Sequence, residues 1–271
     1  MRNLIPQVTF PYKMIQGSFG QRQNGSIRLV DKLYKTLLPQ FKYNKLPAET
    51  LQKTIDEITQ KRVKIIVKNN EDMSFDGGSD ILYSPISDSI TATTLEIPIT
   101  NKKIHIKDFI TIMHEFQHIA DQLFHPKYLL RNQYMYRNGL YSDKYNRLYD
   151  DFIYCREDIS SNKKRKYTIK HLEYKIRHFL RKMSTEDKIN YLQDTRYNLM
   201  MEDQAYYTQF KYAKKMQKKH LPVNKGDLKK ENASHMFTEK IELLKRLTFE
   251  IIKKERELHA VKLKKAKNCK D

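Results

Sequence analysis

The feature that most constrains the fold is the stretch DFITIMHEFQHIAD, residues 108–121, because its apolar and polar side chains separate onto two faces of a helix. At 100° per residue, the apolar set falls within about 120° of arc and forms a face that must be buried. His114 and His118 fall on the opposite face. The stretch therefore predicts a helix that packs on a core and carries two imidazoles one turn apart. The predicted buried face consists of Phe109, Ile112, Met113, Phe116, Ile119, Ala120 and Leu123.

The two histidines form the pattern H-E-x-x-H with Glu115 between them. Imidazoles at positions i and i+4 of a helix can bind one metal ion, and the glutamate can reach a water molecule beside that ion. With nine histidines in 271 residues, composition predicts this pattern about 0.02 times by chance. The spacing therefore favours a zinc site over two unrelated surface histidines.

The residues before this helix predict a helical region followed by a small sheet. Residues 26–60 have apolar positions at helical spacing, with breaks at Pro39 and Pro47, and we expect them to pack over the sheet. Proline cannot donate to a β-ladder, so Pro98 predicts that the strand around residues 93–99 lies at an edge. Beyond Leu123 the pattern becomes helical. The strands are predicted from three β-rich stretches, residues 62–69, 81–84 and 89–100.

With these motifs in place, the sequence resembles the zincin metallopeptidases, in which an H-E-x-x-H helix follows an edge strand that binds extended substrate. The resemblance covers residues 62–125 with good specificity and residues 126–215 through one further motif. It implies an α+β, zincin-like fold with a small mixed or antiparallel sheet, a substrate-binding edge strand, an active-site helix and a helical second half. The expected domains are a metallopeptidase domain at 1–215 and a basic helical extension at 216–271.

The third metal ligand is the further motif. The extended pattern H-E-x-x-H-x-x-G-x-x-H fails, because Asp121 stands in place of the glycine and Phe124 in place of the third histidine. This excludes the metzincin branch. The gluzincin branch takes a carboxylate from a later helix, often as E-x-x-A, and Glu202 with Ala205 has that form.

Other candidates for the third ligand stay open. On a helical wheel Asp203, and not Glu202, falls inside the apolar stripe, so Asp203 is a rival. Glu157 is a further carboxylate candidate. His125 follows the histidine pair but is expected to lie past the helix end, before Pro126.

The resemblance implies zinc-dependent hydrolysis of peptide bonds in a protein substrate, with His114, His118 and Glu202 as ligands and Glu115 as general base. Asp121 is expected to accept a hydrogen bond from a ligand imidazole or to be an ordinary surface aspartate. The donor that stabilises the oxyanion stays open among four residues. These four residues are Tyr206, Tyr207, His171 and His178.

Composition bears on partners and location. The net charge is +20, and more than half of it lies from Lys211 onward, which predicts an anionic partner for the lysine-rich tail. Two cysteines are too few for a disulfide framework. Without a secretory h-region or a long apolar run, we expect no transmembrane segment and a protein that is cytoplasmic or exported without a cleaved signal. A silent zincin-like binding protein and a basic nucleic-acid or membrane-surface module are the alternatives to an enzyme.

Overall fold

The computed structural model of the chain describes seven stretches, in which helices predominate and two small sheets occur. The described residues group into two compact units. Residues 1–130 belong with 201–236, and residues 131–200 belong with 237–271. The seven described stretches are residues 19–59, 65–70, 78–84, 89–98, 102–124, 169–228 and 237–268.

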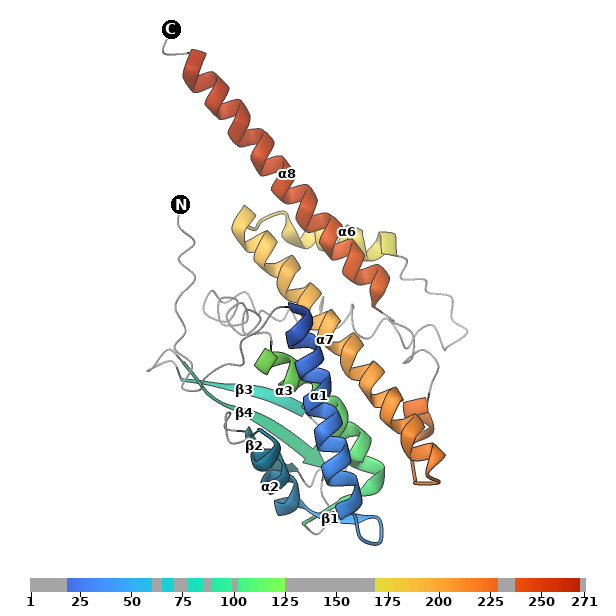
Figure 1. The fold of residues 1–271 in the computed structure, drawn as a ribbon. Helices are drawn as coiled ribbons and strands as arrows, with labels where there is room; N and C mark the ends of the chain where they lie inside the picture. The colour runs from blue at the N-terminus through green and yellow to red at the C-terminus, as the bar shows by residue number, and fades with distance from the viewer. Residues whose placement is uncertain are drawn as a thin grey trace. The chain divides into compact units, whose positions relative to one another are not determined.

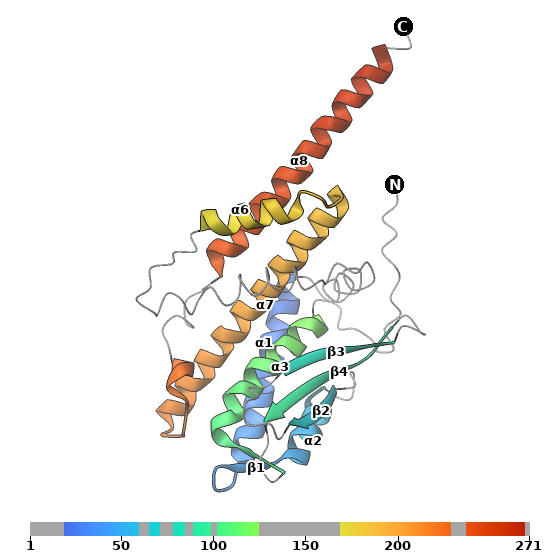
Figure 2. The same ribbon diagram turned by 180° about the vertical axis from the view of Figure 1, so that it is seen from behind.

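Within residues 1–130, the described part of the first unit contains three α-helices, α1, α2 and α3 (Figure 1). Helix α1 contacts both α2 and α3, and it runs beside α3 in both views (Figures 1 and 2). The predicted breaks are confirmed, since Pro39 lies in a 3-10 turn after α1 and Pro47 directly precedes α2. The bounds are α1 Phe19–Leu37, η1 Leu38–Gln40, α2 Ala48–Thr59, η2 Ile106–Asp108 and α3 Phe109–Phe124.

The strands form two sheets. One is antiparallel and pairs β1 (Lys45–Pro47) with β5 (Lys103–His105). The other is mixed, with the order β2-β4-β3, and β4 is parallel to β2 and antiparallel to β3. Helix α2 contacts β2, and α3 contacts β3 and β4. The expected α+β class is therefore confirmed. The three strands of the mixed sheet are β2 (Ile65–Asn70), β3 (Gly78–Ser84) and β4 (Ser89–Pro98).

The prediction that the strand containing Pro98 lies at an edge is wrong, because β4 is the central strand. Pro98 is tolerated there because it is the last residue of the strand. The pairing with β3 begins further in, with Gly78 opposite Glu96, and only the parallel pairing with β2 extends to Pro98. A missing N–H at the end of a ladder costs much less than one in its middle.

The core of the first unit lies on the apolar face predicted for α3. All seven predicted residues, from Phe109 to Leu123, are buried. Helix α1 approaches this helix closely at Gly25, where a Cβ atom would lie 2.1 Å from Cε1 of Phe124. The C-terminal part of α7 (Thr185–Lys218) adds Tyr212, Ala213 and Met216 to the same core.

The second unit contains α6 (Ile169–Leu180), the N-terminal part of α7 and α8 (Thr238–Asn268). Helices α6 and α8 pack together, and the rings of Phe179 and Tyr191 join α6 to α7 with their centroids 4.9 Å apart. At the start of the C-terminal segment, Phe237, Leu244 and Leu247 are buried. The tail helix thus groups with residues 131–200, whereas the predicted domain boundary at residue 215 lies inside α7.

Charged side chains also join α6 to α8. Glu173 accepts hydrogen bonds from Arg177 and Arg246, and Glu250 accepts from the same two arginines. The four side chains form a closed ring of alternating charge across the two helices. Among the helices that the structure describes, none has an apolar stretch that would cross a membrane.

Candidate metal centre

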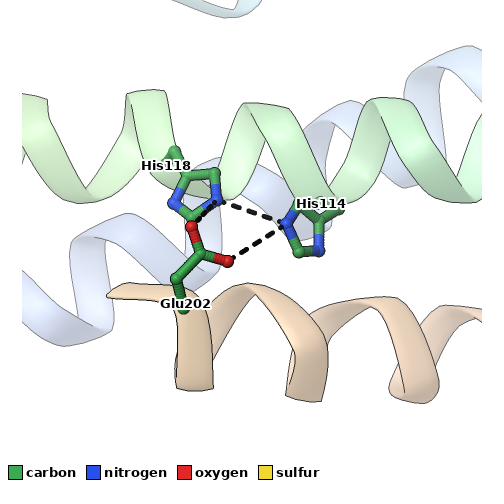
Figure 3. Close-up of side chains that lie close together, drawn as sticks. All are labelled: His114, His118 and Glu202. Carbon is green, nitrogen blue, oxygen red and sulfur yellow. Dashed lines mark hydrogen bonds and ion pairs between the residues drawn. The ribbon is translucent and has the colours of Figure 1, made fainter. Parts of the chain in front are cut away.

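Three potential metal ligands come together where α3 and α7 meet. His114 and His118 project from α3 towards Glu202 of α7 (Figure 3). The Nε2 atoms of the two histidines are 3.2 Å apart. Glu202 places Oε2 3.7 Å from Nε2 of His114 and Oε1 3.5 Å from Nε2 of His118. The structure therefore brings the predicted ligands into one cluster.

The distances between these donors suit a tetrahedral zinc site. Bonds of about 2.0–2.1 Å at tetrahedral angles place neighbouring donor atoms about 3.4 Å apart. The three separations of 3.2, 3.7 and 3.5 Å lie near that value. Two imidazole nitrogens and one carboxylate are also a donor set that Zn²⁺ prefers in catalytic sites, where three protein ligands leave a fourth position open. Both the geometry and the chemistry of the cluster fit zinc.

The cluster borders solvent without being fully exposed to it. The side chains of His114, His118 and Glu202 retain 12%, 9% and 23% of their exposure. Within the described part of the chain, these are the residues whose ligand atoms form a group suited to a metal ion. The three side chains are therefore largely, but not completely, shielded from bulk water.

The position of Glu202 on α7 separates it from its neighbour Asp203. One residue of an α-helix turns the side chain by about 100°. Glu202 therefore meets the histidines, and Asp203 is buried at 9% exposure in another direction. The sequence wheel placed Asp203 correctly among buried positions. Ala205 is fully buried one turn beyond Glu202, where the resemblance expects a small residue.

The charges of the three side chains are coupled. Burial disfavours the charged carboxylate, but the two imidazoles outweigh it and lower the pKa of Glu202 to about 2. Burial also favours a neutral ring in His114, yet Glu202, Glu115 and Gln209 together raise the pKa of His114. Burial lowers the pKa of His118. Glu202 is therefore held as a carboxylate, the form that binds a metal.

Glu115 lies beside the cluster, since its charge acts on both histidines and favours their protonated forms. It is half-buried on α3, next to His114 in the chain. In the H-E-x-x-H pattern this is the residue that the resemblance expects to act as general base.

Two further residues contact His114 or its partner, and the sequence analysis did not identify them. Nδ1 of His114 lies 3.0 Å from Oε1 of Gln209. Nε2 of Gln209 donates to Oδ1 of Asp227 at 2.6 Å. Gln209 follows Glu202 by about two helical turns, which is a spacing that would have indicated a common face of α7. Asp227 lies in the 3-10 turn Lys225–Leu228, and no sequence signal connects it with the motif.

The expected role of Asp121 beside a ligand imidazole is not what the structure shows. Asp121 is buried and accepts hydrogen bonds from Ser26 of α1 and from Gln117, the latter at 2.8 Å. Gln117 in turn accepts from Thr208 of α7 at 2.9 Å. Asp121 falls between the histidine face and the apolar face of α3, and the neighbouring α1 covers it. It therefore joins helices and is neither a surface aspartate nor a partner of His118.

The four candidates for stabilising an oxyanion all lie within the described residues. The ring of Tyr206 meets that of His114 edge-on, with centroids 4.9 Å apart. Tyr207 is 40% exposed, and His171 and His178 belong to the other compact unit. Among the four candidates for stabilising an oxyanion, Tyr206 has a ring contact with the proposed ligand His114. The other two candidates for the third ligand, His125 and Glu157, lie outside the described residues.

Comparison of the chain with protein-family models, with curated proteins and with solved structures found no match. The likeness to zincins therefore rests on the motif and on the cluster of His114, His118 and Glu202.

Proposed function

We propose that this protein is a zinc-dependent metalloendopeptidase that hydrolyses peptide bonds in a protein substrate. The observation that carries the proposal is the cluster of His114, His118 and Glu202, whose donor atoms have the spacing of a tetrahedral site. His114, His118 and Glu202 are the proposed ligands of the zinc ion. Glu115, one residue after His114, is the proposed general base.

Different residues of the chain are proposed to carry out the separate steps of hydrolysis. Bound zinc would act as a Lewis acid and lower the pKa of a coordinated water towards about 7. Glu115 accepts the proton of the attacking water and returns it to the leaving amine. Tyr206, on the same turn of α7 as Ala205 and close to His114, is our choice for the donor that stabilises the oxyanion.

The substrate is proposed to bind as an extended segment beside the sheet. The strand that contains Pro98 was expected to bind the substrate, but it is the central strand β4. The substrate-binding strand must therefore be an outer strand. Among the described strands, β3 pairs on one side with β4 and contacts α3, the helix of the two histidines. Its other side can form main-chain hydrogen bonds with an added strand. Cleavage should therefore require an unstructured segment in the target.

An intact Glu115 favours an enzyme over a protein that binds metal without turnover. A ligand set alone would serve either role, whereas a carboxylate directly after the first histidine is needed for proton transfer. The ligand set does not bear on the compartment in which the enzyme works, which is predicted from the sequence alone.

The test compares metal content and hydrolysis in matched variants. The purified wild type should bind about one Zn²⁺ per chain and cleave an unfolded protein substrate. His118→Ala should lose the metal, and Glu115→Gln should keep the metal and lose hydrolysis. His259→Ala, on the exposed part of α8, is the control and should change neither. Full zinc retention by His118→Ala would exclude the proposed metal site. If the protein binds zinc but hydrolyses no substrate in a survey, the protein binds metal without being an enzyme.

A further inference from the structure

A side-chain amide lies between the proposed ligand His114 and a buried aspartate. Gln209 places Oε1 3.0 Å from Nδ1 of His114 and donates from Nε2 to Oδ1 of Asp227 at 2.6 Å. All three residues belong to the same compact unit. The arrangement differs from the usual one, in which a carboxylate or a carbonyl contacts the ligand imidazole directly.

The chemistry of each group fixes the direction of these bonds. An ionised carboxylate only accepts hydrogen bonds, so the NH₂ group of Gln209 must face Asp227. The carbonyl of the same amide then faces His114, and a carbonyl only accepts. Nδ1 of His114 must therefore carry the proton of the neutral ring. The lone pair is left on Nε2, the atom that lies 3.7 Å from Glu202.

We infer that Asp227, acting through Gln209, selects the ring tautomer of His114 in which Nε2 is free to bind a metal. The inference rests on the proposed metal site for its functional meaning. Asp227 and Gln209 are positioning residues, since neither is itself a ligand. Without Asp227 the amide of Gln209 could turn over and present its NH₂ group to Nδ1, which would move the ring proton to Nε2 and block metal binding.

The burial of Asp227 supports a role beyond local structure. Asp227 is 8% exposed, its Oδ1 accepts from Gln209, and its Oδ2 has no partner among the described residues. A backbone hydrogen bond from Asn224 also favours the carboxylate form. A buried carboxylate with one unpaired oxygen is costly, and the bond from Gln209 is the contact that connects it with His114.

The fold holds Asp227 beside Gln209 by returning the chain along α7. After the helix ends at Lys218, the N–H of Leu221 bonds to the carbonyl of Met216. Leu221 and Leu228 then pack against the core. The 3-10 turn that contains Asp227 is thereby fixed next to α7.

The experiment measures the tautomer in zinc-free protein by nitrogen NMR of the histidine rings, at a pH above the observed titration of His114, because Glu202 and Gln209 raise the pKa of that ring. The signals of His114 are identified by their absence in His114→Asn. The wild type should show the proton on Nδ1. Asp227→Asn should give a mixture of tautomers, because an asparagine both donates and accepts and leaves Gln209 free to turn. Zinc affinity should fall by about 10-fold.

A second variant restores the direction of the bonds. Combining Gln209→Glu with Asp227→Asn places a carboxylate against Nδ1 and an amide donor behind it, so the ring should return to a single tautomer with the proton on Nδ1. Asp56→Asn is the matched control. Asp56 also accepts from a glutamine, Gln52, at 2.9 Å, and it has no contact with His114.

The outcomes separate this inference from the proposed function. An unchanged tautomer in Asp227→Asn, or a mixture in the double variant, overturns the inference. If Asp227→Asn does not fold, the double variant decides alone, since a single Nδ1–H tautomer supports the inference and a mixture overturns it. A wild type that fails to hydrolyse any peptide would contradict the proposed function and leave the tautomer measurement valid.

Discussion

Oε1 of Glu202 lies 3.5 Å from Nε2 of His118, whereas the neighbouring Asp203 leaves the helix about 100° further round and is buried. The two neighbouring carboxylates therefore have different roles. Glu202→Gln should weaken zinc binding by about 10-fold or more, because a coordinating oxygen is replaced by a poorer donor. The measurement is a titration with a competing chelator.

Asp203→Asn provides the matched comparison for Glu202→Gln. It should leave the zinc affinity close to that of the wild type and lower the thermal midpoint instead, since Asp203 is 9% exposed. If the two variants exchange these effects, Asp203 is the ligand and the proposed centre is wrong in that residue.

Gly25 should resist even the smallest enlargement. A helical glycine replaced by alanine ordinarily gains about 1 kcal/mol of stability. At Gly25, however, the added Cβ would lie 2.1 Å from the ring of Phe124, and overpacking of this kind costs about 1–3 kcal/mol. Gly25→Ala should therefore lower the free energy of unfolding, as measured by denaturant titration.

Gly226 is the control for that substitution, because nothing lies within 4 Å of a Cβ built there. Gly226→Ala should be neutral or stabilising. In the background of Phe124→Leu, Gly25→Ala should cost less than in the wild type. An equal cost in both backgrounds would place the clash elsewhere.

Asp121 should make stability depend on pH. Burial raises the pKa of Asp121 to about 7, although bonds from Ser26 and Gln117 favour its ionised form. In the unfolded chain the pKa of this carboxyl is near 3.8. Between these two values the folded state binds the extra proton, so this contribution to stability is complete at low pH and is lost as the pH rises through about 7.

The measurement compares Asp121→Asn with the wild type from about pH 5 to about pH 8. The wild type should lose stability relative to the variant by up to about 3 kcal/mol over this range. A difference that does not change with pH would mean that Asp121 is already ionised in the folded state at about pH 5.

The charged ring between α6 and α8 should contribute modestly. Glu173 accepts two bonds from Arg246, the shorter at 2.7 Å, but the side chains are 22% and 49% exposed. A double-mutant cycle of Glu173→Gln and Arg246→Gln should give a coupling of about 0.5–1 kcal/mol that decreases in high salt. The isolated pair Lys245–Glu242, which is more exposed, should give a coupling near zero. Equal couplings for the two pairs would mean that the ring adds nothing to a single contact.

The elements that the sequence predicted well depend on local pattern. The buried face of α3 follows from helical periodicity, and all seven residues assigned to it are buried. The breaks at Pro39 and Pro47 follow from the geometry of proline. Glu202 came from a motif that carries a spacing and a chemical role, and the structure brings it to the histidines.

The elements that the sequence missed depend on contacts between distant segments. Pro98 indicated an edge strand, because composition does not say that it is the final residue of a central strand. Asp121 was expected either to face a ligand imidazole or to lie on the surface, but it is buried against Ser26 of α1, which lies 95 residues away in the sequence. Asp227 reaches the site through a turn that follows α7, and only the folded chain reveals its bond to Gln209.

The close approach of Gly25 to Phe124 also bears on how this chain could diverge. A side chain at position 25 requires a smaller residue at position 124, so the two positions must change together and not one at a time. The constraint links two residues that are far apart in the sequence, and it does not restrict the residues between them. Distant relatives are therefore better sought by requiring such pairs alongside H-E-x-x-H than by matching continuous stretches of sequence.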